Sequence, residues 1–229
     1  MYNTITRAQN TFGFFTSVAF FVAAVIALSD LLAPRAPSVG SLKTTNVQVV
    51  KGRPHYYSSK KEEYAIIKFS LDADLSDLFT WNTKQVFVYV TAEWPDDSKA
   101  AAGTNATNQA VIWDQIITSP SADHLANIGP AAMRKLKKSA EGKSIDPNRG
   151  KLRIKNQKPK YQITHPSSKI AETDKVVLKL HYNVQPWVGI LTWNQDRDIG
   201  SWKALKGGVS KAFKLPALKV KENKDKKKP

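Results

Sequence analysis

The stretch Phe12–Leu28, FGFFTSVAFFVAAVIAL, contains no charged side chain. The last charge before it is Arg7 and the first after it is Asp30, beyond which the apolar run resumes as far as Ala33. A helix over Phe12–Ala33 would be ~33 Å long at 1.5 Å per residue, close to the ~30 Å thickness of a bilayer's hydrocarbon core. The stretch therefore predicts one membrane-spanning helix with the rest of the chain on one side.

A cleaved secretory signal is the second interpretation of the same stretch. Arg7 would then supply the basic n-region, and Ala27-Leu28-Ser29 would be a small-x-small cleavage site before Asp30. The apolar region would be 17 residues long, longer than the roughly 7–15 residues usual for a signal peptide. Length therefore favours a retained anchor. Both interpretations place the chain on the secretory route and argue against a cytosolic enzyme.

The flanking charges alone do not decide the orientation of the helix in the membrane. Basic residues are scarce before the helix and frequent after it. Those after the helix include Arg35, Lys43, Lys51 and Arg53. The positive-inside rule then places the large domain in the cytosol, although long domains translocate largely regardless of charge. The N-x-[ST] sequon at Asn105 lies in the polar stretch 96–109, and it favours a lumenal domain that is glycosylated there.

The chain after the helix shows the period-2 alternation of half-buried strands. In Val176–Val184 every second side chain is apolar, and Gln85–Ala92 is apolar on both faces, which predicts a central strand. The other candidate strands are Thr44–Val50, Tyr64–Leu71, Val111–Ile117, Lys151–Ile154, Tyr161–Thr164, Gly189–Asn194 and Ala212–Val220. Short strands separated by turn residues predict an antiparallel β-sandwich over residues 34–220. The predicted fold class is mainly β, with one N-terminal transmembrane helix.

The formal net charge of +16 is concentrated in two segments. Arg134–Lys160 has 11 basic and 2 acidic residues, and Lys203–Pro229 has 10 basic and 2 acidic residues. We expect a basic loop/helix region at 130–160, with a helix beginning near Pro130, and a Lys-rich disordered tail at 221–229. Solvated mobile segments and attraction to anionic lipid or RNA both fit such runs. No aromatic side chain interleaves with the tail lysines, so no specific nucleic-acid partner is predicted.

The sequence contains no catalytic signature. It has no cysteine, so thiol catalysis, disulfides and thiolate metal sites are excluded. The histidines form no ligand pattern, and no G-x-S-x-G elbow is present. These histidines are His55, His124, His165 and His181. We therefore predict no catalytic, cofactor-binding or metal-binding residue.

The six tryptophans are many for a domain of this size. On pattern, Trp113 and Trp81 are expected in the core. Trp187, Trp193 and Trp202 cluster among polar, Gly and Pro residues near the C-terminal end. Packing at the sheet ends and an interface with a partner or a membrane both remain open for these three.

Several blocks of the chain resemble the signal peptidase complex subunit 3 family of the endoplasmic reticulum. The resemblance begins in Asn3-Thr4-x-x-Arg7-Ala8, before the apolar run. It is strongest in residues 69–75 (FSLDADL), 78–85 (LFTWNTKQ) and 88–93 (VYVTAE). It continues in residues 108–114 (NQAVIWD) and 182–191 (YNVQPWVGIL). These blocks follow one order across most of the chain.

The resemblance implies a single-pass protein of the endoplasmic reticulum membrane. Residues 1–11 would be a short cytosolic N-terminus, 12–33 a retained signal-anchor helix, and 34–220 a lumenal β-sandwich, with Asn105 in a loop that family members often glycosylate. The subunit would have no catalytic residues. It would support the catalytic subunit, which uses Ser, His and Asp to remove signal peptides, alongside two small membrane subunits. The alternative is a membrane-anchored lumenal carbohydrate- or protein-binding module.

Overall fold

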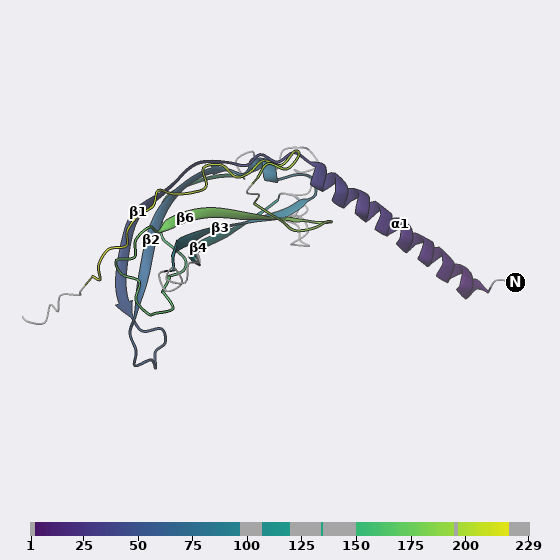
Figure 1. The fold of residues 1–229 in the computed structure, drawn as a ribbon. Coiled ribbons are helices and arrows are strands. Elements are labelled where there is room, and N and C mark those ends of the chain that lie inside the picture. The colour runs from purple at the N-terminus through teal and green to yellow at the C-terminus, as the bar shows by residue number, and fades with distance from the viewer. Residues whose placement is uncertain (1–2, 97–106, 120–133, 135–149, 195–196, 220–229) are drawn as a thin grey trace, which may run out of the picture.

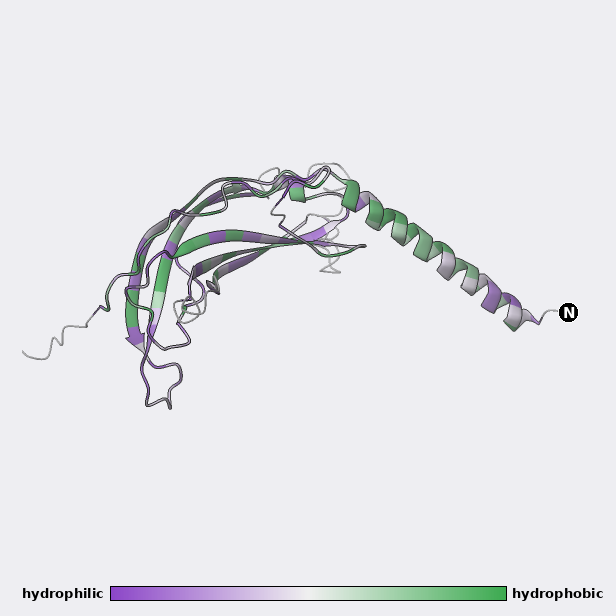
Figure 2. Ribbon diagram, in the orientation of Figure 1, coloured by the Kyte–Doolittle hydropathy of each residue, from purple (hydrophilic) through white to green (hydrophobic). Residues whose placement is uncertain are grey.

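The apolar run forms one helix that projects from a β domain (Figure 1). The computed structural model describes residues 3–96, 107–119, 134, 150–194 and 197–219. Helix α1 (Thr4–Leu32) includes nearly all of the predicted span and starts earlier than predicted. Its length and composition suffice to cross a membrane. In Figure 2 most of the α1 ribbon is coloured hydrophobic, and its N-terminal end is hydrophilic.

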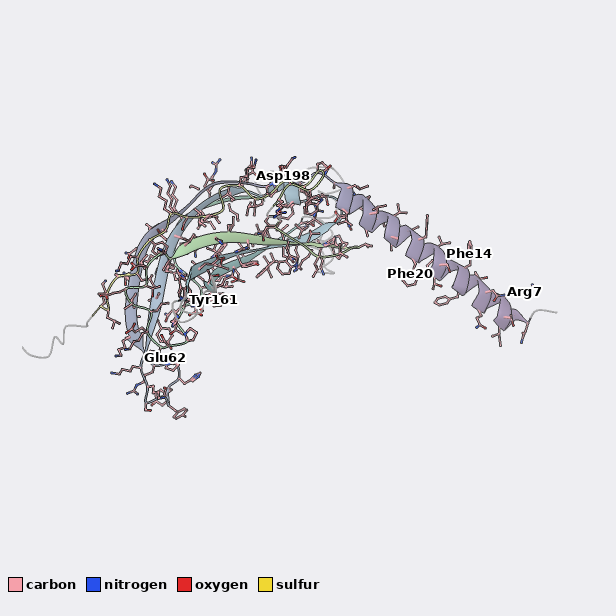
Figure 3. All side chains as sticks on the ribbon, viewed as in Figure 1. Arg7, Phe14, Phe20, Glu62, Tyr161 and Asp198 are labelled. Atoms are coloured by element: carbon pink, nitrogen blue, oxygen red, sulfur yellow. The ribbon has the colours of Figure 1, made fainter. Side chains whose placement is uncertain are left out.

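Nearly all of α1 is uncovered by the rest of the protein. Phe14 is 73% exposed and Phe20 is 78% exposed, and both side chains point away from the domain (Figure 3). Asp30 is the one buried residue of this helix. A helix that is apolar all round and uncovered in the chain needs an apolar surrounding, so its exterior is suited to lipid.

Two antiparallel sheets form the domain (Figure 1). The first has the order β1-β2-β5, and the second has the order β4-β3-β6-β7. The strands are β1 (Ser38–Gly52), β2 (Glu62–Asp74), β3 (Thr83–Pro95), β4 (Thr107–Thr118), β5 (Lys151–Gln157), β6 (Val177–Pro186) and β7 (Thr192–Trp193). A short 3₁₀ helix, η1 (Ser76–Leu78), leads from the first sheet to the second. The predicted fold class is confirmed.

One apolar core lies between the two sheets. Alternate residues of β2 and β6 are buried in it, as their period-2 patterns predicted. β3 pairs with both β4 and β6, which confirms the central strand. Phe69 of the first sheet meets Trp113 of the second edge to face, with ring centroids 5.8 Å apart. Trp113 is therefore a core residue, as predicted.

The prediction for Trp81 is wrong. Its side chain is 70% exposed, because Trp81 lies in the turn that precedes β3 rather than on a strand. The next residue, Asn82, is only 2% exposed. The turn thus directs a polar amide inward and the indole outward.

Three weaker strand predictions need correction. Tyr161–Thr164 contributes only an isolated bridge between Ile163 and Ala65, and Gly189–Asn194 shortens to the two residues of β7. Over 212–219 the chain makes an isolated bridge at Phe213 instead of a strand. Pro216 lacks the N–H that a strand ladder needs there. The helix expected near Pro130 and the tail at 221–229 fall outside the described residues.

Candidate functional site

The end of α1 meets the sandwich in a junction built from segments far apart in the sequence. Pro34 follows the helix, and its ring disfavours continuation of the helical conformation at Ala33. The chain then turns into β1, so the last turn of α1 is held against the domain. The segments that contact it come from the turn before β3, from β7 and from residues 199–202.

A buried ion pair lies at the centre of this junction. Arg35 Nη2 donates a hydrogen bond to Asp30 Oδ1 at 2.6 Å, and the two residues are 0% and 4% exposed. The Thr80 hydroxyl donates to the same carboxylate oxygen at 3.2 Å. Arg35 Nη1 approaches the Thr192 hydroxyl at 3.4 Å. Burial of a charge is tolerated when it is paired and hydrogen-bonded, and these contacts meet that requirement at Nη1 and Nη2, while Arg35 Nε has no hydrogen-bond partner among the described residues.

Trp202 covers the ion pair and caps the helix. Its ring lies 4.2 Å from the Arg35 guanidinium carbon, a cation–π distance. Its indole N–H donates to the Leu31 carbonyl at 2.8 Å, one of the carbonyls that the end of a helix leaves without an intrahelical partner. The backbone N–H of Arg35 donates to Ser201, and that of Lys203 donates to Arg35. The segment after β7 therefore fixes the exit of the chain from α1.

Buried and apolar groups lie beside the junction. Tyr182 is fully buried nearby, and burial raises the pKa of its hydroxyl, while the positive charge of Arg35 opposes this rise. A cavity of about 410 Å³ lies beside the junction. It is lined by Leu31, Leu32, Thr192, Ile199, Gly200, Ser201 and Trp202. The cavity therefore has a largely apolar lining beside the ion pair.

The loop between β6 and β7, residues 187–191, lies next to α1. The side-chain amide of Asn82 holds it, since Nδ2 donates to the Val188 carbonyl at 2.7 Å and Oδ1 accepts from the Val188 N–H at 3.2 Å. Gly189 approaches the helix so closely that a Cβ built on it would lie 3.6 Å from Ala27 Cα. Its φ of +134° is one that side-chain-bearing residues rarely adopt. The loop is therefore fixed against the helix.

The structure separates the three C-terminal tryptophans. Trp187 is 39% exposed on the β6–β7 loop, where Lys84 Nζ lies 5.2 Å from its ring centroid. Trp193 is 52% exposed on β7. Trp202 is 7% exposed and contacts groups of its own chain. Of the other predicted site residues, Asn105 lies outside the described part of the chain.

Titratable groups elsewhere make local contacts. His181 on β6 stacks on Tyr89 and lies 3.1 Å from the Thr91 hydroxyl. His165 contacts the Ser167 hydroxyl at 2.7 Å in a turn. Over the described ranges, no three His, Asp or Glu side chains are grouped to hold a metal ion. His124 lies outside those ranges.

Sequence reasoning missed the residues that build the junction, namely Asp30, Arg35, Thr80 and Asn82. One signal was available. A carboxylate inside a segment of bilayer length is costly in lipid and calls for a partner. The first basic residue after Asp30 is Arg35. The pairing could have been inferred from that proximity, whereas Thr80 and Asn82 carry no local signal.

Comparison with known proteins places the chain among subunits of one complex. A family model described as "Signal peptidase subunit" matches residues 1–133 and 145–204. "Signal peptidase complex subunit 3" of Debaryomyces hansenii is 31% identical over 89% of this chain and 94% of that protein. The proteins of that name from Yarrowia lipolytica and Homo sapiens are 29% and 28% identical, over 95% and 83% of this chain and 100% and 87% of theirs. Because the family model covers well over half of the chain, this protein belongs to the signal peptidase complex subunit 3 family.

Proposed function

We propose that this chain is a non-catalytic subunit that supports the catalytic subunit of the signal peptidase complex while that subunit removes signal peptides. The buried Asp30–Arg35 pair carries the proposal, because it couples the apolar helix to the sandwich at one fixed geometry. A domain held in this way can keep a partner's active site at a set height above the bilayer. Misplacing a catalytic group by about 1 Å can cost on the order of 10²-fold in rate.

The proposed topology is a single-pass protein of the endoplasmic reticulum membrane. Residues 1–11 are cytosolic, the part of α1 from residue 12 onward is a retained anchor surrounded by lipid, and the sandwich is lumenal. Two observations support retention of the anchor. Cleavage after Ser29 would make Asp30, one half of the buried ion pair with Arg35, the first residue of the mature chain. Cleavage would also remove Ala27, which the β6–β7 loop approaches.

The proposed partners are the catalytic subunit and the small membrane subunits of the complex. Lumenal exposure of the sandwich also makes Asn105 a glycosylation acceptor. Thr107, the third residue of that sequon, is the first residue of β4, and it is exposed. The sequon therefore leads directly into a strand at the edge of the four-stranded sheet.

Co-purification tests the subunit role. The full chain with an affinity tag is expressed together with the catalytic subunit, and both association and signal-peptide cleavage are measured in mild detergent. We expect the catalytic subunit to co-purify and to lose activity or stability when this chain is absent. If the two proteins do not associate, and the catalytic subunit is unaffected by this chain, the proposal is wrong.

Sidedness is tested separately in sealed microsomes. We expect the sandwich to resist added protease until detergent is present. We also expect endoglycosidase treatment to shift the mass of the wild-type chain but not that of Asn105→Gln. Digestion of the sandwich in intact microsomes would overturn the lumenal topology, and a mature N-terminus at Asp30 would overturn the retained anchor.

A further inference from the structure

We propose that the β6–β7 loop, residues 187–191, together with Trp193 and Ile199, is embedded in the membrane beside α1 as a lipid-contacting collar. The inference rests on the proposed anchoring by α1 and adds a second membrane contact made by the β domain itself. Its occupant is the bilayer: acyl chains around the loop tip and headgroups around the tryptophans. This surface is called the collar below.

The depth of the loop along the helix carries the argument. A Cβ added to Gly189 would be in van der Waals contact with Ala27, and Ala27 is inside the charge-free run Phe12–Leu28. Ala27 precedes Leu32, the last residue of α1, by five residues, a distance of ~7.5 Å along the axis. If the charge-free run lies in the hydrocarbon core, the loop tip reaches the boundary of that core.

The side chains of the collar suit that depth. Ile190 is 60% exposed, Leu191 is 57% exposed and Ile199 is 61% exposed. Ile190 and Leu191 are consecutive, and Ile199 lines the same cavity as the next residue, Thr192. Exposed apolar side chains gathered in this way indicate an interaction site. Trp187 lies on the β6–β7 loop and Trp193 lies on β7. Tryptophan is enriched where hydrocarbon meets headgroups. Lys84, over the Trp187 ring, provides a cation at headgroup level.

The collar is continuous with the apolar end of α1. Leu28 and Leu32 are 58% and 68% exposed on the helix. The cavity of about 410 Å³ between the last turn of α1 and residues 199–202 is lined by Leu31 and Ile199 among others, so lipid hydrocarbon fits it. The Asn82 amide holds the loop backbone by two hydrogen bonds. A preorganised apolar surface of this kind binds at lower entropic cost than a mobile one.

The collar also accounts for a carboxylate near the membrane boundary. Asp30 lies between Ala27, which the loop approaches, and Leu31, whose carbonyl accepts a hydrogen bond from Trp202. The β domain therefore encloses the ion pair on the side where lipid would otherwise meet it. Charges within a membrane-spanning segment are tolerated when protein shields and pairs them.

Site-specific labelling tests the inference. Because the chain has no cysteine, an introduced cysteine is the only thiol in the chain that can be labelled. Full-length variants Ile190→Cys and Leu191→Cys are labelled with an environment-sensitive fluorophore and reconstituted in phosphatidylcholine vesicles. Phe14→Cys serves as the helix control. Tyr57→Cys serves as the aqueous control, because Tyr57 is 93% exposed in the connection between β1 and β2, at the opposite end of the domain from α1 (Figure 1).

We expect acyl-chain nitroxide lipids to quench the labels at positions 190, 191 and 14. We also expect iodide to quench the loop labels several-fold less than the label at position 57. If the label at 14 is quenched by lipid while those at 190 and 191 are quenched only by iodide, the collar is wrong and the anchor stands. Quenching of the label at 14 by iodide would overturn the anchor and the collar together.

The same variants in microsomes, with the assembled complex, separate lipid from protein as the occupant. Quenching of the loop labels by nitroxide lipid there supports the collar. Loop labels shielded from both lipid quencher and iodide would mean that another subunit covers the loop, and the inference would be overturned.

Discussion

The carboxylate of Asp30 and the guanidinium of Arg35 form a hydrogen-bonded ion pair at 2.6 Å that solvent barely reaches. One partner is in the last turn of the apolar helix and the other in the chain that leads into β1. Thr80, Thr192 and Trp202 add contacts from three further segments. The orientation of α1 relative to the sheets therefore depends on a polar cluster, although apolar contacts dominate the core.

Breaking this pair will strongly destabilise the protein. Arg35→Met leaves the Asp30 carboxylate buried without its counter-charge, and we expect a loss of about 3–5 kcal/mol in the free energy of unfolding. The double variant Asp30→Leu/Arg35→Met removes both charges and should recover most of that loss, because apolar residues replace buried pairs well. Thermal unfolding of the full chain in detergent micelles measures both.

The surface pair Lys203–Asp198 is the matched control for that experiment. Its atoms are 3.7 Å apart, and the two side chains are 52% and 47% exposed. Lys203→Met should change stability by less than about 1 kcal/mol, since exposed pairs contribute little. Equal effects of Arg35→Met and Lys203→Met would show that the buried pair is no more important than a surface one.

Replacement of Trp202 by Phe will weaken the cap on α1. The change removes the indole N–H that donates to the Leu31 carbonyl at 2.8 Å, while a ring remains over Arg35. A lost hydrogen bond of this kind costs about 0.5–1.5 kcal/mol. Hydrogen exchange at the last turn of α1 should also become faster. Trp81→Phe is the control, because Trp81 is 70% exposed, and no change in stability or exchange at α1 is expected from it.

The strands were predictable where one local rule decides them. β6 alternates because one face packs in the core. In β3, Val86, Val88 and Val90 face the core, while Phe87 and Tyr89 stack on the half-buried opposite face. Trp81 was assigned wrongly because hydrophobicity does not reveal a turn that directs the indole outward. The strand predicted over residues 212–219 was wrong for a similar reason. Polar and apolar residues alternate there as in a strand, but Pro216 lacks the N–H that a strand ladder needs.

The junction could be predicted only in part. Asp30 stands out as a charge in an apolar segment, which indicates a shielded partner. Asp30 contacts Thr80, 50 positions away, and the neighbouring Leu31 carbonyl contacts Trp202, 171 positions away in the chain. No short-range pattern encodes such a cluster, because it depends on how β3, β7 and the C-terminal segment pack around the helix.

Two glycines with positive φ should differ sharply in their response to alanine. At Gly207, with φ +78°, an added Cβ would overlap the Val39 carbonyl oxygen, whereas at Gly200, with φ +55°, nothing lies within 4 Å of it. The left-handed conformation costs about 1–2 kcal/mol at both positions. Overpacking adds roughly 1–3 kcal/mol at Gly207 alone. Chemical denaturation of the two variants tests this, and a Gly200→Ala variant as unstable as Gly207→Ala would contradict it.

Asp74 gives the domain an acid-sensitive contribution to stability. Ser76, through its hydroxyl and its backbone N–H, which donates to Oδ1 at 3.0 Å, lowers the pKa of Asp74 below its ordinary value of 3.8. A carboxyl whose pKa is lowered by folding stabilises the protein above the unfolded-state pKa. That stabilisation is lost as pH falls through the folded-state pKa. The melting temperature of wild type should therefore decline on acidification below about pH 4 partly through this group.

Asp74→Asn tests this contribution, because the amide keeps an acceptor oxygen for the Ser76 N–H but carries no charge. We expect the variant to melt below wild type at pH 6, and the difference to shrink as the pH falls below the ordinary Asp pKa of 3.8. Ser76→Ala keeps the backbone N–H that donates to Asp74, so this variant should retain pH dependence. If the melting temperatures of wild type and Asp74→Asn stayed parallel from pH 6 to pH 2, the carboxylate at the end of β2 would not be the titrating group.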